Sequence, residues 1–104
     1  MKLMTNICRY IARGICINND RVLLAQAAGK DNFFLIGGGI KMYESASNAL
    51  VREIKEEIQK ESTINSFVGV IENLWTDKGN SVYEINFLFD VDIFLPTFVV
   101  HDSE

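Results

Sequence analysis

Apolar and polar positions alternate along most of the chain, in runs that predict strands on either side of one helical segment. The run 7–17 is rich in strand-forming residues, and Asn18-Asn19-Asp20 is a turn signal that leads into a second run at 21–25. We therefore expect a hairpin over these two runs. A polar loop at 28–32 precedes a short apolar strand, Phe33 to Ile36, which ends at a run of glycines that we interpret as a turn.

A helical pattern follows the glycines. Leu50, Val51, Ile54 and Ile58 recur on one side of a helix, and Ser45 stands just before the pattern, where serine commonly caps a helix. We expect the helix to bury this side against the rest of the protein and to present a neighbouring side to a cleft.

Alternation returns after the helix, where 63–75 and 81–94 predict two long strands joined by a polar turn at 76–80. The expected fold class is α/β (α+β), a mixed β-sheet with the helix on one face. The chain has 104 residues, of which 48% are hydrophobic, so it is long enough for one core and too short for two domains. We expect a single domain over 1–104.

The charge of the chain excludes a broad nucleic-acid surface. The net charge is −4 at pH 7, so no large basic area is available for a phosphate backbone. An acidic protein that approaches a polyphosphate needs cations to mediate the contact.

The chain has no feature that directs it to a membrane or out of the cell. Cys8 and Cys16 are the only cysteines, and their apolar neighbours favour buried thiols over a disulfide. The first five residues do not resemble a signal peptide, and the apolar stretch 85–100 is short and contains two aspartates and a proline. We expect a cytoplasmic protein without membrane contact.

The candidate chemistry lies on the predicted helix. Glu53, Glu56 and Glu57 point into one sector, because successive residues of a helix are separated by about 100°. Like charges on one side weaken a helix unless they are neutralised, and a hard divalent cation that prefers oxygen ligands would do this. The ordinary alternative is a solvated acidic surface whose repulsion is offset by Arg52 and nearby lysines. Glycines immediately before the helix favour a ligand site, since they let bare backbone approach a ligand.

The same residues resemble the signature of a known family. Gly38, Glu44, Arg52-Glu53-Ile54 and Glu56-Glu57, separated by five, seven and one residues, are similar to the Nudix box of the Nudix hydrolases. The resemblance implies the Nudix fold and hydrolysis of nucleoside diphosphates linked to another group, with Mg²⁺ or Mn²⁺ as cofactor. The box spans Gly38 to Lys60 and departs from the family pattern at Ile36, Gln59 and Lys60. Because Gln59 replaces a helix-ending glycine, we expect the helix to run on or to end less sharply.

The resemblance also implies roles for the box residues. Glu53, Glu56 and Glu57 are the implied metal ligands, with the backbone carbonyl of Gly37 as a fourth. Glu53 is our first candidate for the general base and Glu56 the second. The resemblance further implies two catalytic residues that do not bind the metal. Arg52 orients the cluster and Glu44 is its partner, since a guanidinium can hold a carboxylate through two hydrogen bonds.

Several residues outside this cluster are candidates for completing the site. Glu84 lies in an alternating strand and could add a metal ligand, although a glutamate on the solvent side of a strand is common. Candidate substrate-binding residues are Gly38, Gly39, Arg13, Phe34, Trp75 and Tyr83. The aromatic side chains could stack on a base, but aromatic residues in strands are more often core residues.

These observations predict a metal-dependent hydrolase that cleaves the pyrophosphate linkage of a nucleoside diphosphate derivative: a nucleoside triphosphate, dinucleoside polyphosphate, nucleotide sugar or similar small molecule. The alternatives are a catalytically impaired Nudix-like protein that binds nucleotide, and an acidic helix that docks another protein.

The end of the sequence differs from the family. Nudix domains generally continue into a further strand and a second long helix, whereas the segment 95–104 is short and contains a proline. We expect a C-terminally truncated domain that lacks this helix and leaves half of the sheet uncovered. An uncovered apolar face favours self-association, so we expect a homodimer or a destabilised fragment.

Overall fold

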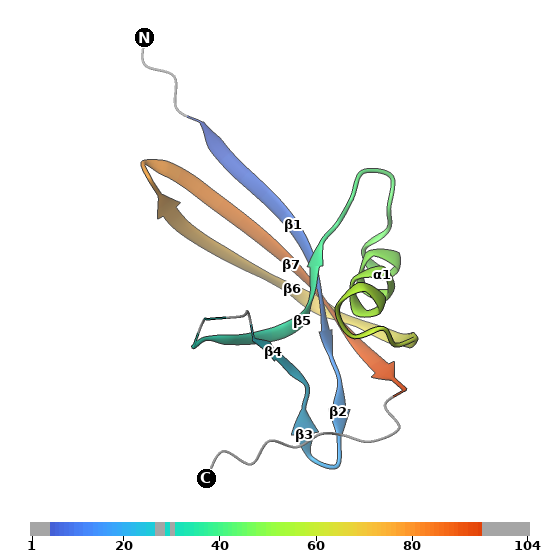
Figure 1. The fold of residues 1–104 in the computed structure, drawn as a ribbon. Coiled ribbons are helices and arrows are strands. Elements are labelled where there is room, and N and C mark those ends of the chain that lie inside the picture. The colour runs from blue at the N-terminus through green and yellow to red at the C-terminus, as the bar shows by residue number, and fades with distance from the viewer. Residues whose placement is uncertain (1–4, 27–28, 30, 95–104) are drawn as a thin grey trace.

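The computed structural model describes residues 5–26, 29 and 31–94 (Figure 1). The secondary-structure elements in this part are β1 (Asn6–Ile15), β2 (Ile17–Asn18), β3 (Arg21–Val22), β4 (Leu24–Gln26), β5 (Phe33–Gly39), α1 (Ala46–Ile58), β6 (Ser62–Asp77) and β7 (Asn80–Ile93). The segment 95–104, on which the expected loss of the C-terminal helix rests, lies outside the described residues. In the described part of the chain, no helix is long and apolar enough to cross a membrane.

The sheet has the strand order β4-β5-β1-β7-β6. Its central strand β1 runs parallel to β7 and antiparallel to β5, which makes the sheet mixed, as the sequence predicts. In Figure 1, β6 and β7 form a long twisted hairpin, and α1 lies against one face near the end where β5 crosses β1. The predicted fold class is therefore confirmed.

The hairpin predicted over 7–17 and 21–25 is much shorter in the structure, so the predicted length is wrong. Only the two-residue strands β2 and β3 pair across the Asn19-Asp20 turn, where both residues have positive φ angles of 52° and 61°. The longer strand β1 instead pairs with β5 and β7, which come from later in the sequence. Ile11 and Ala12, on opposite faces of β1, are both buried, as expected for a central strand covered on both sides.

The glycine run forms the end of a strand, and the predicted turn is therefore misplaced. Gly37, Gly38 and Gly39 pair with Arg13, Ala12 and Ile11 of β1 as the last part of β5.

Gly37 has a φ of 146°, and a Cβ atom at this residue would lie 1.9 Å from the Ala12 carbonyl oxygen. Only glycine permits this pairing without moving the backbone. The chain turns further on, where Tyr43 has a φ of 64° and the amide of Glu44 donates to the Lys41 carbonyl.

The core forms between α1 and the sheet. Ala49, Leu50 and Ile54 of α1 are fully buried against Ile36 of β5 and Val91 of β7, among others. As predicted, Ser45 caps the helix: its hydroxyl accepts a hydrogen bond from the Asn48 amide at 3.1 Å. The apolar side that the sequence predicts thus holds α1 on the sheet.

The end of α1 also corrects an expectation. The helix ends at Ile58, and Gln59 adopts the left-handed conformation with φ 55° and ψ 40°. Its amide donates to the Lys55 carbonyl at 2.9 Å, and its side-chain Nε2 donates to the Glu56 carbonyl at 2.9 Å. These bonds satisfy carbonyls of the last turn, so the prediction that the helix ends less sharply without glycine is wrong.

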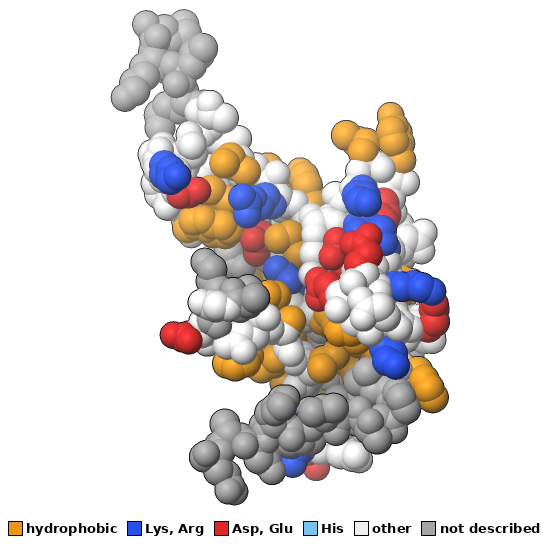
Figure 2. All heavy atoms as spheres, in the orientation of Figure 1, with side chains coloured by type: hydrophobic (Ala, Val, Ile, Leu, Met, Phe, Trp, Pro, Cys, Tyr) orange, Lys and Arg blue, Asp and Glu red, His pale blue; other side chains and the backbone are white. Residues whose placement is uncertain are grey.

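The helix covers only one end of the sheet. Beyond it, exposed apolar side chains lie on β1, β6 and β7: Tyr10, Phe67, Val68, Val70, Ile71, Leu74, Trp75 and Tyr83. Figure 2 shows apolar side chains at the surface of this part, while acidic and basic side chains gather over α1. The sheet therefore presents apolar surface in the described part of the chain.

Candidate active site

Arg52 joins the charged residues of the box. Its Nε and Nη2 atoms donate to the two carboxylate oxygens of Glu44 at 2.7 and 2.9 Å, a bidentate pair. Its Nη1 donates to Glu53 at 2.8 Å and to Glu56 at 3.3 Å. Nη2 also donates to the Gly39 carbonyl oxygen at 2.9 Å. One guanidinium therefore connects the helix to the preceding loop and to the end of β5.

The Glu44 carboxylate is held on both sides. Besides Arg52, the backbone amide of Lys41 donates to its Oε1 at 3.1 Å. The hydrogen bonds from Arg52 and then from Lys41 lower the pKa of Glu44 from its ordinary 4.5 to about 2. The same bond to Glu44 raises the pKa of Arg52 above its already high value. Both groups therefore stay charged at neutral pH, and the loop stays attached to α1.

Gly38 makes room for the Glu53 carboxylate. A Cβ atom at Gly38 would lie 2.5 Å from the carboxylate carbon of Glu53, closer than real contacts allow. The carboxylate therefore lies directly over bare backbone of β5. At Gly39, by contrast, no atom lies within 4 Å of the Cβ position.

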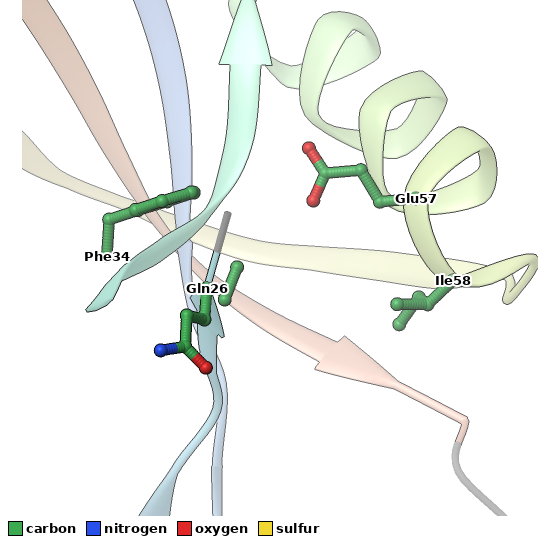
Figure 3. Close-up of a pocket in the computed structure, with 5 residues that line it drawn as sticks. Gln26, Phe34, Glu57 and Ile58 are labelled. Atoms are coloured by element: carbon green, nitrogen blue, oxygen red, sulfur yellow. The ribbon is translucent and has the colours of Figure 1, made fainter. Parts of the chain in front are cut away.

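Glu57 is the carboxylate of the cluster whose environment most favours the neutral form. Burial raises the pKa of Glu57, the charge of Glu53 raises it further, and Arg13 opposes the rise. The side chain lines a cavity of about 440 Å³ with Ala25, Gln26, Phe34 and Ile58. In Figure 3, the Glu57 carboxylate points from α1 into this cavity, and Phe34 projects from β5 on its other side.

The carboxylate oxygens of the box suit a hard cation, but they do not converge on one point. Within residues 5–26, 29 and 31–94, no group of three His, Cys, Asp or Glu side chains converges in a way that could hold a metal ion. Glu56 turns toward Arg52, and its side chain is 54% exposed. Glu53 and Glu57 crowd each other, which is the unfavourable interaction that a divalent cation relieves. The metal site formed by the three glutamates and the Gly37 carbonyl therefore stays a prediction. The hydrogen bond from Arg52 to the Gly39 carbonyl was not predicted from the sequence.

A second cavity, of about 200 Å³, brings together three residues that were predicted separately. Arg13, Phe34 and Glu84 line it together with Leu35, Ile71, Asn73, Asn86 and Leu88. The Arg13 guanidinium carbon lies 5.2 Å from the centroid of the Phe34 ring, and its Nη1 donates to the Leu35 carbonyl at 3.1 Å. Arg13 is therefore fixed over β5.

Glu84 contacts Asn86, which sequence reasoning missed. Glu84 Oε1 accepts a hydrogen bond from Asn86 Nδ2 at 3.0 Å, and no contact among the described residues joins Glu84 to the box carboxylates. Phe89 and Val91 of β7 pack in the core with α1, so alternation places Glu84 and Asn86 on the opposite face of the sheet. The signal for Asn86 was a polar residue inside an apolar strand. The proposed metal role of Glu84 stays untested.

Trp75 and Tyr83 lie elsewhere. Both line a different cavity, near the end of the β6–β7 hairpin, of about 190 Å³. Trp75 pairs with Val82 and Tyr83 with Leu74, so the two aromatic side chains occupy opposite faces of the sheet. Of the four predicted substrate-binding side chains, the structure therefore groups Arg13 with Phe34 only.

The sequence matches a known family model over most of its length. The sequence model of the NUDIX domain matches residues 9–100. Among curated proteins, none matches the chain significantly.

Solved structures share the fold. A UDP-X diphosphatase superposes with a TM-score of 0.73 at 16% identity, over 97% of this chain and 48% of the other. A MutT NUDIX hydrolase from Burkholderia pseudomallei has a TM-score of 0.64 at 19% identity, over 90% of this chain and 91% of the other. An ADP-ribose pyrophosphatase from Streptococcus suis has a TM-score of 0.56 at 20% identity, over 86% and 66%. The chain thus spans about half the length of the UDP-X diphosphatase.

The three adjacent glycines predict an order of sensitivity to alanine. Gly37→Ala should destabilise the fold by about 3 kcal/mol or more, because the new Cβ meets the Ala12 backbone at a positive φ. Gly39→Ala should change stability by less than about 1 kcal/mol. Gly38→Ala should fall nearer to Gly39→Ala, since the obstructing Glu53 carboxylate can move. Urea denaturation of the three variants measures the order, and equal losses at all three positions would contradict it.

The lowered pKa of Glu44 predicts an acid-sensitive contribution to stability. A carboxylate with a lowered folded-state pKa adds stability that is fully present above the unfolded value and is lost as the pH falls through the folded value. The Glu44–Arg52 pair should therefore contribute above pH 4.5 and cease to do so near pH 2. Urea unfolding in metal-free buffer across this range should show a flatter pH dependence for Glu44→Gln than for the unmodified protein. Identical profiles would show that the pair contributes nothing.

Proposed function

We propose that this chain, which belongs to the Nudix family, is a metal-dependent pyrophosphohydrolase that cleaves the diphosphate linkage of a nucleoside diphosphate derivative. The observation that carries the proposal is the Arg52 network, which brings Glu44, Glu53 and Glu56 to the glycine end of β5. A solvated acidic helix would not require a partly buried bidentate pair or a carboxylate set against glycine. The names of two structural neighbours, a UDP-X diphosphatase and an ADP-ribose pyrophosphatase, support the same reaction class.

Glu53, Glu56 and Glu57 would hold the cofactor, Mg²⁺ or Mn²⁺, with the Gly37 carbonyl as a further ligand. Their oxygens match the preference of these ions, which bind few carboxylates and keep other positions for water and phosphate. When bound, the ion supplies positive charge for the phosphate oxygens on which negative charge develops.

The residues of the chain itself would position and deprotonate the attacking water. Arg52 holds Glu53 and Glu56 by Nη1, which limits the directions in which both carboxylates can point. Glu53 is the first candidate for the general base and Glu56 the second. Glu44 acts through Arg52 as a positioning residue, because its bidentate grip fixes the guanidinium plane.

A second candidate function is nucleotide binding with impaired catalysis. It is favoured by the carboxylates of the described residues, which do not yet converge as a set of three, and by the departures from the box at Gln59 and Lys60. Release of product from any nucleotide decides between the two functions.

We place the protein in the cytoplasm. The two cysteines are free thiols, with Cys8 exposed and Cys16 buried, which supports a reducing compartment. The substrate is a small nucleotide, because the net charge of −4 offers no broad basic surface for nucleic acid.

We also propose a homodimer that forms through β6. This 16-residue strand is at the edge of the described sheet, and six of its exposed side chains are large and apolar. It contains neither lysine nor proline, the residues that commonly protect an edge strand from pairing. If two copies pair antiparallel about the middle of β6, Glu72 lies opposite the Phe67-Val68 region of its partner. Like charges then do not face each other.

Removal of one predicted metal ligand tests the catalytic proposal. A panel of nucleoside triphosphates, dinucleoside polyphosphates and nucleotide sugars should yield product with Mg²⁺ or Mn²⁺ and none with a chelator. Glu53→Gln should lower turnover on the best substrate by on the order of 100-fold, because it removes a ligand and candidate base. Glu72→Gln, on exposed β6, is the matched control and should keep its activity. Binding of nucleotides without product would favour the impaired protein instead.

The dimer proposal predicts a response to charge on β6. The unmodified protein should have the mass of a dimer in light scattering. Leu74→Lys should shift the mass toward the monomer, because Leu74 is 60% exposed on β6 and a lysine on an edge strand opposes pairing with another strand. Met42→Lys places the same charge on an exposed loop and should leave the dimer intact. A monomeric mass for the unmodified protein refutes the proposal.

A further inference from the structure

We propose that the 200 Å³ cavity between β1, β5, β6 and β7 receives the base of the substrate, and that Glu84 and Asn86 select guanine. This inference rests on the proposed function, since it names the nucleotide that the same site would accept. Three features of the cavity support a base: its position, its flat and apolar surfaces, and its hydrogen-bonding groups.

The cavity lies next to the box. Phe34 lines both this cavity and the one into which Glu57 points (Figure 3). Arg13 lines the base cavity, and its charge acts on the Glu57 carboxyl. A ligand with its diphosphate at the box and its organic group in this cavity would therefore pass beside Arg13, the cation best placed to contact its phosphates.

The walls suit a planar ring. Phe34 and the Arg13 guanidinium, 5.2 Å apart, both present flat surfaces on which bases stack. Ile71 and Leu88 supply apolar contacts. The volume is below the roughly 300 to 1,000 Å³ of pockets that enclose whole ligands, so it fits one part of a nucleotide better than all of it.

Besides the donors Arg13 and Asn73, the cavity is lined by Glu84 and Asn86, which offer hydrogen-bond acceptors. Asn86 is 5% exposed, and its Nδ2 donates to Glu84 Oε1 at 3.0 Å and to the Ile71 carbonyl oxygen at 3.4 Å. Both partners accept hydrogen bonds, so the amide nitrogen must face them and both of its N–H groups are used. In the described part of the chain, no donor contacts the remaining oxygens, Asn86 Oδ1 and Glu84 Oε2. These two acceptors are available to a ligand.

Such a pair of acceptors selects a ligand edge with neighbouring donors. Guanine presents a ring N–H and an amino group side by side on its Watson–Crick edge. Adenine and cytosine present an amino group beside an acceptor nitrogen, and uracil presents one N–H between two carbonyls. A buried acceptor that faces another acceptor is left unsatisfied, which penalises these three bases. The acceptor oxygens of Glu84 and Asn86 thus favour guanine over the other three bases.

The test compares four substrates that differ only in the base: GDP-, ADP-, UDP- and CDP-glucose, each hydrolysed with Mg²⁺. The unmodified protein should have its highest kcat/KM on GDP-glucose, by about 10- to 100-fold. Glu84→Gln should reduce the ratio of GDP-glucose to ADP-glucose by about tenfold or more, because one carboxylate oxygen becomes a donor. Glu72→Gln, the same change on the opposite face of the sheet, should leave the ratio as it is.

The outcomes separate this inference from the proposed function. An equal loss on all four substrates in Glu84→Gln would overturn base selection and indicate a role in catalysis or metal binding. If neither these four nucleotide sugars nor any nucleotide of the wider panel is hydrolysed, the proposed function fails, but calorimetry with GMP, AMP, UMP and CMP on the unmodified protein still tests the inference. Tighter binding of GMP supports it, and equal binding of the four overturns it. The binding measurement also decides the matter if Glu84→Gln does not fold.

Discussion

The arrangement of the candidate active site depends on the ion pair between Arg52 and Glu44. The pair is bidentate, so it fixes the plane of the guanidinium, and the remaining N–H groups then point at Glu53, Glu56 and the Gly39 carbonyl. A lysine could neutralise the same charge but could not direct donors to so many acceptors at once. The network therefore fixes the positions of three elements in one site: the end of β5, the loop before α1 and α1 from its middle onward.

The backbone of β5 is shaped to receive this network. Gly37 must lack a side chain because the Ala12 carbonyl oxygen lies 1.9 Å from the Cβ position, and at Gly38 the lack of a side chain leaves room for the Glu53 carboxylate. Both residues are paired with β1, the central strand, so the floor of the site is part of the rigid sheet. Leu50 and Ile54, fully buried on α1, hold the helix above that floor. Core packing and site geometry are thus set by the same helix, whose two sides differ in chemistry.

Local signals in the sequence predicted the helix, its Ser45 cap and the β6–β7 hairpin, because period, capping residue and turn residues act over a few positions. The resemblance to the Nudix box implied Glu44 as a partner of Arg52, and the two residues are hydrogen-bonded. The pairing of β1 was missed, since strands distant in sequence decide it. The glycine run was mistaken for a turn because glycine also permits close approach within a sheet. Gln59 adopts a left-handed conformation that propensity disfavours, and hydrogen bonds to the last turn of α1 accompany it. Asn86 could be recognised only when its neighbours in space were known.

The sheet separates two kinds of chemistry that a nucleotide hydrolase needs close together. Carboxylates for a cation project from α1 on one face, while the acceptors of Glu84 and Asn86 lie on the other, where alternation along β7 places them. The proposed substrate would contact both, and β5 connects them: its side chain Phe34 lines both cavities, and Arg13 from β1 lies over it. Arg13 thus places a positive charge beside the Phe34 ring and close enough to act on the box residue Glu57. A chain with the same box and different residues on the far side of β7 would keep the reaction and change the nucleotide.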